Sequence, residues 1–80
     1  MLETRIKKVL SQMFTIPIES INDNTSYDNV PKWDSLAHMN LVIALEEEFA
    51  IKFNHIQMME MLSYPLIVLT MKEILQPIAS

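Results

Sequence analysis

The chain of 80 residues contains no cysteine and no glycine, and each absence removes a class of function. Without cysteine there can be no disulfide, no thiolate nucleophile and no cysteine-ligated zinc. Without glycine there can be no glycine-containing turn of the kind that carries the nucleophilic serine of many hydrolases. These absences favour a protein that is not an enzyme.

Basic residues are also scarce, and long apolar runs are missing. The chain has six Lys and Arg residues and ten Asp and Glu residues, which gives a net charge of −4. Nucleic-acid binding depends on clustered basic side chains, so we expect no nucleic-acid partner. No apolar run approaches the roughly 20 residues that span a bilayer, and the N-terminus is amphipathic, unlike a signal peptide. We expect a cytoplasmic monomer that does not bind membranes.

The length and composition predict a single domain over residues 1–80. Half of the residues are hydrophobic, which suffices for a folded core and excludes general disorder. A chain of this size buries only about 60% of the surface that it exposes when unfolded. It therefore has little room for both a core and a deep catalytic pocket.

Helical periodicity dominates the sequence and predicts an all-α fold. Apolar residues between Leu2 and Met13 recur on one face, which predicts a first helix over about 2–13. A long connector, 14–33, follows and contains Pro17 and Pro31, with a short helical turn expected near 19–21. We expect its apolar side chains to reach the core and a polar stretch, 22–26, to form an exposed turn. The apolar side chains are Ile16, Ile18, Ile21, Tyr27 and Val30.

Three more helices are predicted from capping residues. The second runs from about Ser35 to Ala50, with Asp34 as the N-cap. Asn54 is suited to cap a short third helix over about 55–62. Ser63 and Pro65 mark the start of a last helix that ends before residue 77. The prediction is a bundle of four helices with a long first loop and a short third helix.

The second helix carries two apolar stripes. At 100° per residue, one stripe forms the expected core face. The other stripe is rotated away from it and has carboxylates nearby, Glu46 and Glu47. Either this helix packs against neighbours on two sides, or the second stripe is an exposed strip that docks a partner or covers an acyl chain. The first stripe is Leu41, Val42, Leu45 and Phe49, and the second is Leu36, Met39 and Ile43.

The tripeptide Asp34-Ser35-Leu36 stands where the connector turns into the second helix. Backbone N–H groups at a helix N-terminus lack intrahelical partners, and the helix dipole favours negative charge there. A serine in this position suits the attachment of a phosphate ester better than it suits catalysis.

With this tripeptide after a long loop, and with Leu45-Glu46-Glu47-Glu48-Phe49 closing the second helix, the chain resembles the acyl carrier protein family over nearly its whole length. The resemblance implies a carrier-protein bundle in which a phosphopantetheinyl transferase attaches 4′-phosphopantetheine from coenzyme A to the Ser35 hydroxyl. The arm's thiol would then hold acyl or aminoacyl groups as thioesters for loading ligases, synthases and transferases. Asp34 would assist recognition or magnesium-dependent transfer, and Leu36 would contact partners.

The chain departs from that family in places. A glycine often precedes the family's Asp-Ser pair, where this chain has Pro31-Lys32-Trp33. Fatty-acid carriers carry more acid early in the second helix, where this chain has Ala37, His38 and Asn40. These differences favour a specialised stand-alone carrier. We expect Met39, Ile43, Glu46 and Glu47, with Leu36, to form its partner face.

Three other interpretations compete with a carrier. Ser35 and His38 could form a nucleophile and base, but the chain lacks the turn and the oxyanion loop that such a site requires. Residues 23–34 match a calcium loop in length, but Asp28 replaces its glycine and Asp34 its glutamate, so no metal is expected. A helical adaptor without a prosthetic group is the main alternative, with Ser35 an ordinary helix-start residue.

Overall fold

The computed structural model describes residues 2–75, which form four α-helices and no β-strand. The all-α prediction is therefore confirmed over this range. A short 3-10 turn, η1, lies between the first two helices where a turn was predicted. The helices are α1 (Leu2–Phe14), α2 (Ser35–Phe49), α3 (His55–Glu60) and α4 (Tyr64–Leu75), and η1 is Ile18–Ser20.

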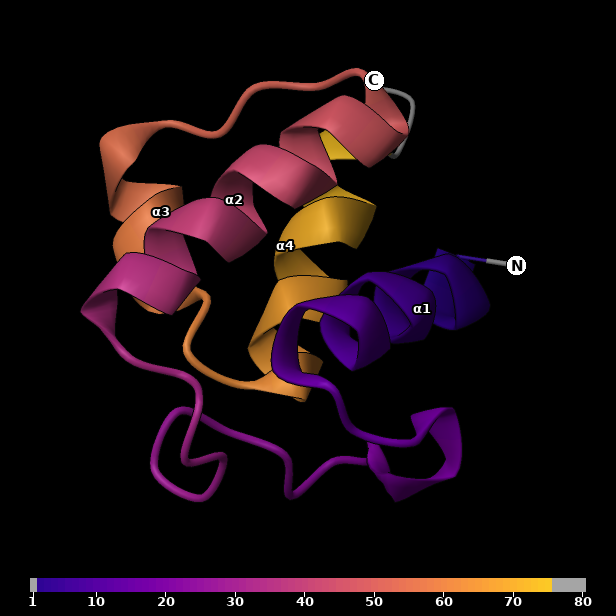
Figure 1. Ribbon diagram of the computed structural model, residues 1–80. Coiled ribbons are helices and arrows are strands. Elements are labelled where there is room, and N and C mark those ends of the chain that lie inside the picture. The colour runs from indigo at the N-terminus through magenta and orange to yellow at the C-terminus, as the bar shows by residue number, and fades with distance from the viewer. Residues whose placement is uncertain (1, 76–80) are drawn as a thin grey trace.

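Helix α1 packs against both α2 and α4. Figure 1 shows α4 passing behind α2, and α3 lying beside the N-terminal end of α2. The segment between α1 and α2, residues 15–34, runs along the bottom of this view and reaches α2 on the side of α3. The start of α2 therefore lies at a junction between the connector and α3.

Capping residues set the helix starts as predicted. The Asp34 carboxylate accepts a hydrogen bond of 2.8 Å from the backbone N–H of Ala37 at the start of α2. Asn54 and Gln57 form a reciprocal capping box at α3, with distances of 2.8 and 2.9 Å. The Ser63 hydroxyl accepts from an N–H in the first turn of α4 at 3.2 Å.

Two helix ends differ slightly from the predictions. Helix α2 ends at Phe49 because Ala50 takes the left-handed conformation, with φ 54° and ψ 48°. Helix α3 ends at Glu60, two residues early, since the backbone of Met61 leaves helical geometry and its side chain turns into the core. The predicted end of the last helix before residue 77 falls next to residues 76–80, which lie outside the described range.

The core forms between α1, α2 and α4, with contributions from the loops. The first stripe of α2 is confirmed as a core face for Leu41, Val42 and Leu45, which are all buried. Their buried partners include side chains from α1 and α4 and the aromatic residues that flank the connector. The set from the other segments includes Ile6, Val9, Leu10, Phe14, Trp33, Ile67 and Met71.

Phe49 was predicted to be a core residue, and the structure corrects this, since the ring is only half-buried. It lies in the last turn of α2, where the Arg5 guanidinium covers it at 4.3 Å from the ring centroid. Arg5 also donates from Nε to the Glu48 carboxylate at 3.1 Å and from Nη2 to the Glu48 carbonyl at 2.8 Å. A cation at the C-terminus of α2 is favourable to the helix dipole.

The connector is held partly by the side chains that were expected to hold it. Ile21 and Val30 are buried, whereas Ile18 is exposed, so the prediction for Ile18 was wrong. It occupies η1, which turns that side chain outward. Thr25, placed in an exposed turn, is instead buried, and its hydroxyl accepts from the N–H of Asn22 at 3.0 Å.

Backbone hydrogen bonds tie this buried part of the connector to the α3–α4 junction. The N–H of Tyr64 donates to the Thr25 carbonyl and the N–H of Tyr27 donates to the Leu62 carbonyl, both at 2.8 Å. They form an isolated antiparallel bridge between Ser26 and Ser63. Period-based sequence reasoning does not detect a single bridge of this kind, because no strand pattern accompanies it.

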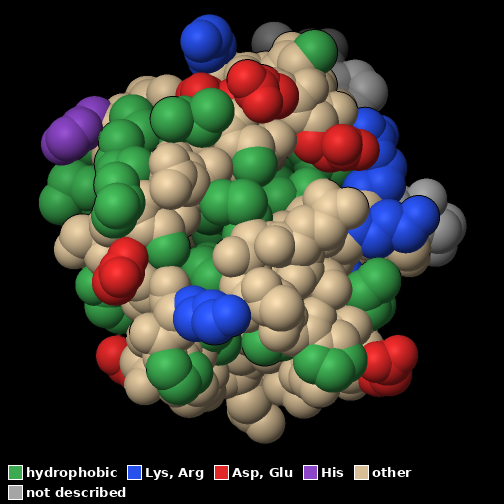
Figure 2. Space-filling model, viewed as in Figure 1, with side chains coloured by type: hydrophobic (Ala, Val, Ile, Leu, Met, Phe, Trp, Pro, Cys, Tyr) green, Lys and Arg blue, Asp and Glu red, His purple; other side chains and the backbone are tan. Residues whose placement is uncertain are grey.

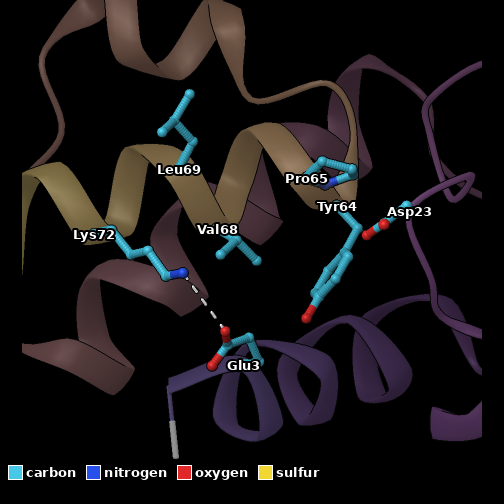
Figure 3. Close-up of a pocket in the computed structure, with 7 residues that line it drawn as sticks. All are labelled: Glu3, Asp23, Tyr64, Pro65, Val68, Leu69 and Lys72. Carbon is cyan, nitrogen blue, oxygen red and sulfur yellow. Dashed lines mark ion pairs between the residues drawn. The ribbon is translucent and has the colours of Figure 1, made fainter.

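A surface hollow of about 370 Å³ lies between α1 and α4 (Figure 3). Lys72 pairs with Glu3 across it at 3.6 Å, and the pKa of Glu3 is lowered by a backbone hydrogen bond and by the Lys72 charge. Figure 3 shows the Tyr64 ring extending toward α1 beside Glu3. Burial raises the pKa of the Tyr64 hydroxyl, and the Glu3 and Asp23 charges add to that shift.

The core assignment predicts unequal costs for two truncations in α2. Leu45→Ala should lower the free energy of unfolding by about 2–5 kcal/mol, because the side chain is fully buried. Phe49→Ala should cost less, since its ring is only partly buried against the core. Urea unfolding followed by circular dichroism measures both values, and equal costs would contradict the phasing of α2.

The raised pKa of the Tyr64 hydroxyl predicts that the free energy of unfolding decreases in alkali. Its pKa is higher in the folded than in the unfolded chain, so its contribution is complete below the unfolded value of about 10. That contribution disappears as the pH rises through the folded pKa. Thermal melts between about pH 8 and about pH 11 should show a smaller decline for Tyr64→Phe than for the parent. Tyr27→Phe, which leaves the hollow intact, is the control and should decline as the parent does.

Candidate functional site

Ser35 is the first residue of α2, and its side chain is exposed. The preceding residue, Asp34, has an extended backbone, with φ −113° and ψ −173°, and its carboxylate caps the helix. The first N–H groups of α2 lack intrahelical partners, and the positive end of the helix dipole lies at the same place. The local geometry therefore offers a hydroxyl open to solvent beside groups that favour a phosphate.

Trp33 fixes the chain immediately before this serine, a role that our sequence reasoning missed. Its ring is 2% exposed and stacks on Phe14 of α1, with the ring centroids 5.0 Å apart. Its backbone N–H donates to the Val30 carbonyl at 2.9 Å. One feature of the sequence indicates this role: the chain's single tryptophan stands two residues before Ser35 and next to a polar stretch.

His38 lies one turn into α2 and is half-buried. Its Nδ1 lies 3.1 Å from the indole Nε1 of Trp33, and its Nε2 lies 2.7 Å from the Met58 carbonyl on α3. Both ring nitrogens are therefore engaged by groups other than Ser35. The imidazole is not placed to act as a base for that serine, which removes the main support for a hydrolase.

The second stripe of α2 is exposed, as one of the two interpretations proposed. Leu36 is 73% exposed, and Met39 and Ile43 are each about half exposed. Figure 2 shows hydrophobic side chains gathered over α3 and the neighbouring part of α2. Exposed side chains on α3, Ile56 and Met59, belong to the apolar surface of this part of the molecule. Met39 and Ile43 still bury about half of their surface, so the stripe is partly exposed and is not a second core face.

The two carboxylates predicted for the partner face differ in their surroundings. Glu46 is half-buried, and its carboxylate accepts a hydrogen bond of 2.9 Å from the backbone N–H of Phe53. It holds the loop that leads from α2 to α3. Glu47 is exposed. Glu47 is therefore the carboxylate more available to another protein.

The polar stretch between Asp23 and Asp34 uses its oxygen atoms within the turn. The Asn29 side-chain carbonyl accepts from the N–H of Ser26 at 3.0 Å, and the Thr25 hydroxyl accepts from the N–H of Asn22. Residues 2–75 contain no group of three acidic, histidine or cysteine side chains placed to hold a metal ion. Within the same range, no helix is both long enough and apolar enough to cross a membrane.

The chain is similar in sequence to a known acyl carrier protein. No protein-family model matches the chain. The chain is 38% identical, over 52 residues, to the acyl carrier protein of Buchnera aphidicola subsp. Schizaphis graminum. The match covers 65% of this chain and 66% of the relative, slightly less than two thirds of its length. The chain is therefore similar to an acyl carrier protein, and its four helices and the exposed, capped Ser35 at the start of α2 are consistent with that similarity.

Proposed function

We propose that this protein carries acyl or aminoacyl groups as thioesters on a 4′-phosphopantetheine arm attached to Ser35. The observation that carries this proposal is the exposed serine at the first position of α2, capped by Asp34 and followed by the exposed Leu36. The similarity to an acyl carrier protein supports a carrier role and not a catalytic one. The chemistry on the cargo would therefore take place in partner enzymes.

Among the serines in residues 2–75, the surroundings favour Ser35 for modification. Ser11 donates its hydroxyl to the Ile16 carbonyl, and the Ser26 and Ser63 hydroxyls accept backbone N–H groups. Ser20 is exposed but lies in η1 and not at the start of an α-helix. Ser35 combines exposure with the donors and the dipole of a helix N-terminus.

The residues around Ser35 fit the attachment of this arm. The Ser35 oxygen would bond to the phosphate next to pantetheine in coenzyme A, its proton would leave, and the bond to the nucleotide phosphate would break. When attached, the arm supplies the thiol that forms the thioester. The backbone N–H groups at the start of α2 favour the phosphodiester charge. Asp34 would hold the helix start and assist recognition or magnesium-dependent transfer.

The partner surface that we propose is the exposed stripe of α2 with its neighbouring carboxylates. It consists of Leu36, Met39, Ile43, Glu46 and Glu47. The apolar side chains would fill contacts on a transferase or loading enzyme, and the acidic ones would attract basic groups. The net charge of −4 favours the same class of basic partner surface.

The pathway that we propose is a specialised one in the cytoplasm, with the chain acting as a monomeric stand-alone carrier. The start of α2 has Ala37, His38 and Asn40 where fatty-acid carriers bear more acid. His38 is occupied by contacts inside this chain, so this position does not offer a partner a charged side chain.

Mass spectrometry of the intact protein tests the attachment. After incubation with coenzyme A, magnesium and a phosphopantetheinyl transferase, the parent should gain one phosphopantetheinyl group. Ser35→Ala should fold as the parent does, because the Asp34 cap remains, and should gain no mass. Ser20→Ala, a change at another exposed serine, is the control and should be modified normally. An unmodified parent with several transferases would favour an adaptor without a prosthetic group.

Transfer kinetics test the partner surface. Met39→Ala should lower kcat/KM for the transferase about thirtyfold if this side chain contributes at the level of an interface hot spot. Leu69→Ala provides the control, because Leu69 is similarly exposed on α4, at 54% against 49% for Met39. Helicity should be unchanged in both variants. Equal rates for the two variants and the parent would refute the assignment of this face.

A further inference from the structure

His38 joins three segments of the chain around Ser35. It belongs to α2, its Nδ1 faces the Trp33 indole on the connector, and its Nε2 faces the Met58 carbonyl on α3. Its ring also lies nearly parallel to the indole, with an angle of 21° and 6.2 Å between centroids. We propose that His38 is a positioning residue that links the Ser35 segment, residues 33–35, to α3. This link breaks when the His38 ring gains a proton.

The two partners of the ring require one protonation state. The indole N–H can only donate, so Nδ1 must accept and cannot carry a proton. The Met58 carbonyl can only accept, so Nε2 must carry the proton. The contacts therefore select the neutral Nε2–H tautomer. A second proton, on Nδ1, would place two N–H groups against each other over 3.1 Å and break the bond to Trp33.

The consequence for Ser35 follows from the position of Trp33. Trp33 stands directly before the Asp34 cap, and its burial fixes how the connector enters α2. In the neutral state, the ring of His38 holds the Trp33 side chain from α2 and holds α3 through its backbone. In the protonated state, the bond to α3 persists and the bond to the connector is lost. The Ser35 segment therefore loses an anchor in acid while the core remains folded.

The two hydrogen bonds, and not the charged groups around His38, determine the protonation state of its ring. The carboxylate of Asp34, one turn before His38, accepts from the N–H of Ala37. The titratable side chains on the connector, the start of α2 and α3 are all exposed to solvent, which screens them. They are Asp28, Lys32, Asp34, His55 and Glu60.

Nuclear magnetic resonance on the unmodified protein tests the coupling without any partner. At about pH 8 the ¹⁵N shifts of His38 should identify the Nε2–H tautomer, and the Trp33 indole proton should exchange slowly. Toward about pH 5, exchange of that proton should become about fivefold to tenfold faster, as expected when one buried hydrogen bond is lost. A protonated Nδ1 at high pH, or unchanged indole exchange after the ring is protonated, would overturn the proposal.

Two substitutions separate the two bonds. His38→Gln keeps a donor at the position of Nε2 but offers no acceptor to Trp33, so indole exchange should be fast at every pH. His38→Asn keeps an acceptor near Nδ1 but does not reach Met58, so indole exchange should stay slow while α3 amides exchange faster. His55→Gln removes the other histidine, which is exposed on α3, and should behave as the parent.

The effect of His38 protonation on the modification of Ser35 rests on the proposed function, and a separate experiment measures it. At about pH 8, transfer to Ser35 should be about fivefold faster for the parent than for His38→Gln, and the two rates should converge at the acidic pH where the ¹⁵N shifts show a protonated His38 ring. Their ratio cancels the transferase's own pH profile. A constant ratio would contradict the positioning role. A parent that is never modified would contradict the proposed function instead, and the resonance experiment would still decide the coupling.

Discussion

The packing of the Trp33 ring is the interaction on which the rest of the site depends. The indole stacks on Phe14 of α1 and lies nearly parallel to the His38 ring of α2, so one side chain joins two helices to the segment between them. Its 2% exposure makes this a core contact and not a surface one. A large aromatic side chain buried at a loop end restricts that loop far more than a polar turn can, because its burial stabilises the fold by several hydrophobic contacts at once. The exposed serine two residues later is thereby carried on a fixed backbone.

The absence of glycine shapes the same scaffold in another way. Two residues with positive φ, Thr15 and Ala50, follow α1 and α2, at positions where many helices use glycine. Each carries a Cβ in the left-handed region, which costs roughly 1 kcal/mol. The tertiary contacts that flank these turns offset that cost: Phe14 is buried under Trp33, and Arg5 binds the last turn of α2. The ends of both helices therefore depend on packing as well as on local preference.

The distribution of apolar side chains separates the two tasks of α2. One stripe, with Leu41 and Leu45, is fully buried and orients the helix, while the other, with Leu36 and Met39, remains in solvent. An exposed apolar strip is the kind of surface that marks an interaction site, and its position beside Ser35 supports the partner surface that we propose. The C-terminal part of α2 also positions the loop that follows it, because the Glu46 carboxylate accepts a hydrogen bond from the loop that leads to α3. The net charge of −4 would favour partners with basic groups on this proposed surface.

Sequence alone determined the features that local chemistry controls. Periodicity located the helices, the short polar caps Asp34 and Asn54 located the starts of α2 and α3, and the phase of α2 separated its two apolar stripes. That the second stripe is exposed came from the structure. Ser35 was identifiable because its helix-start position is a local property. Only the tertiary structure decided that Trp33 is the anchor of the site, that His38 reaches Met58, that Thr25 is buried and that Phe49 is covered by Arg5. These are contacts between residues distant in the chain or set by the packing of whole segments, and no periodic pattern encodes which side chain another segment will cover.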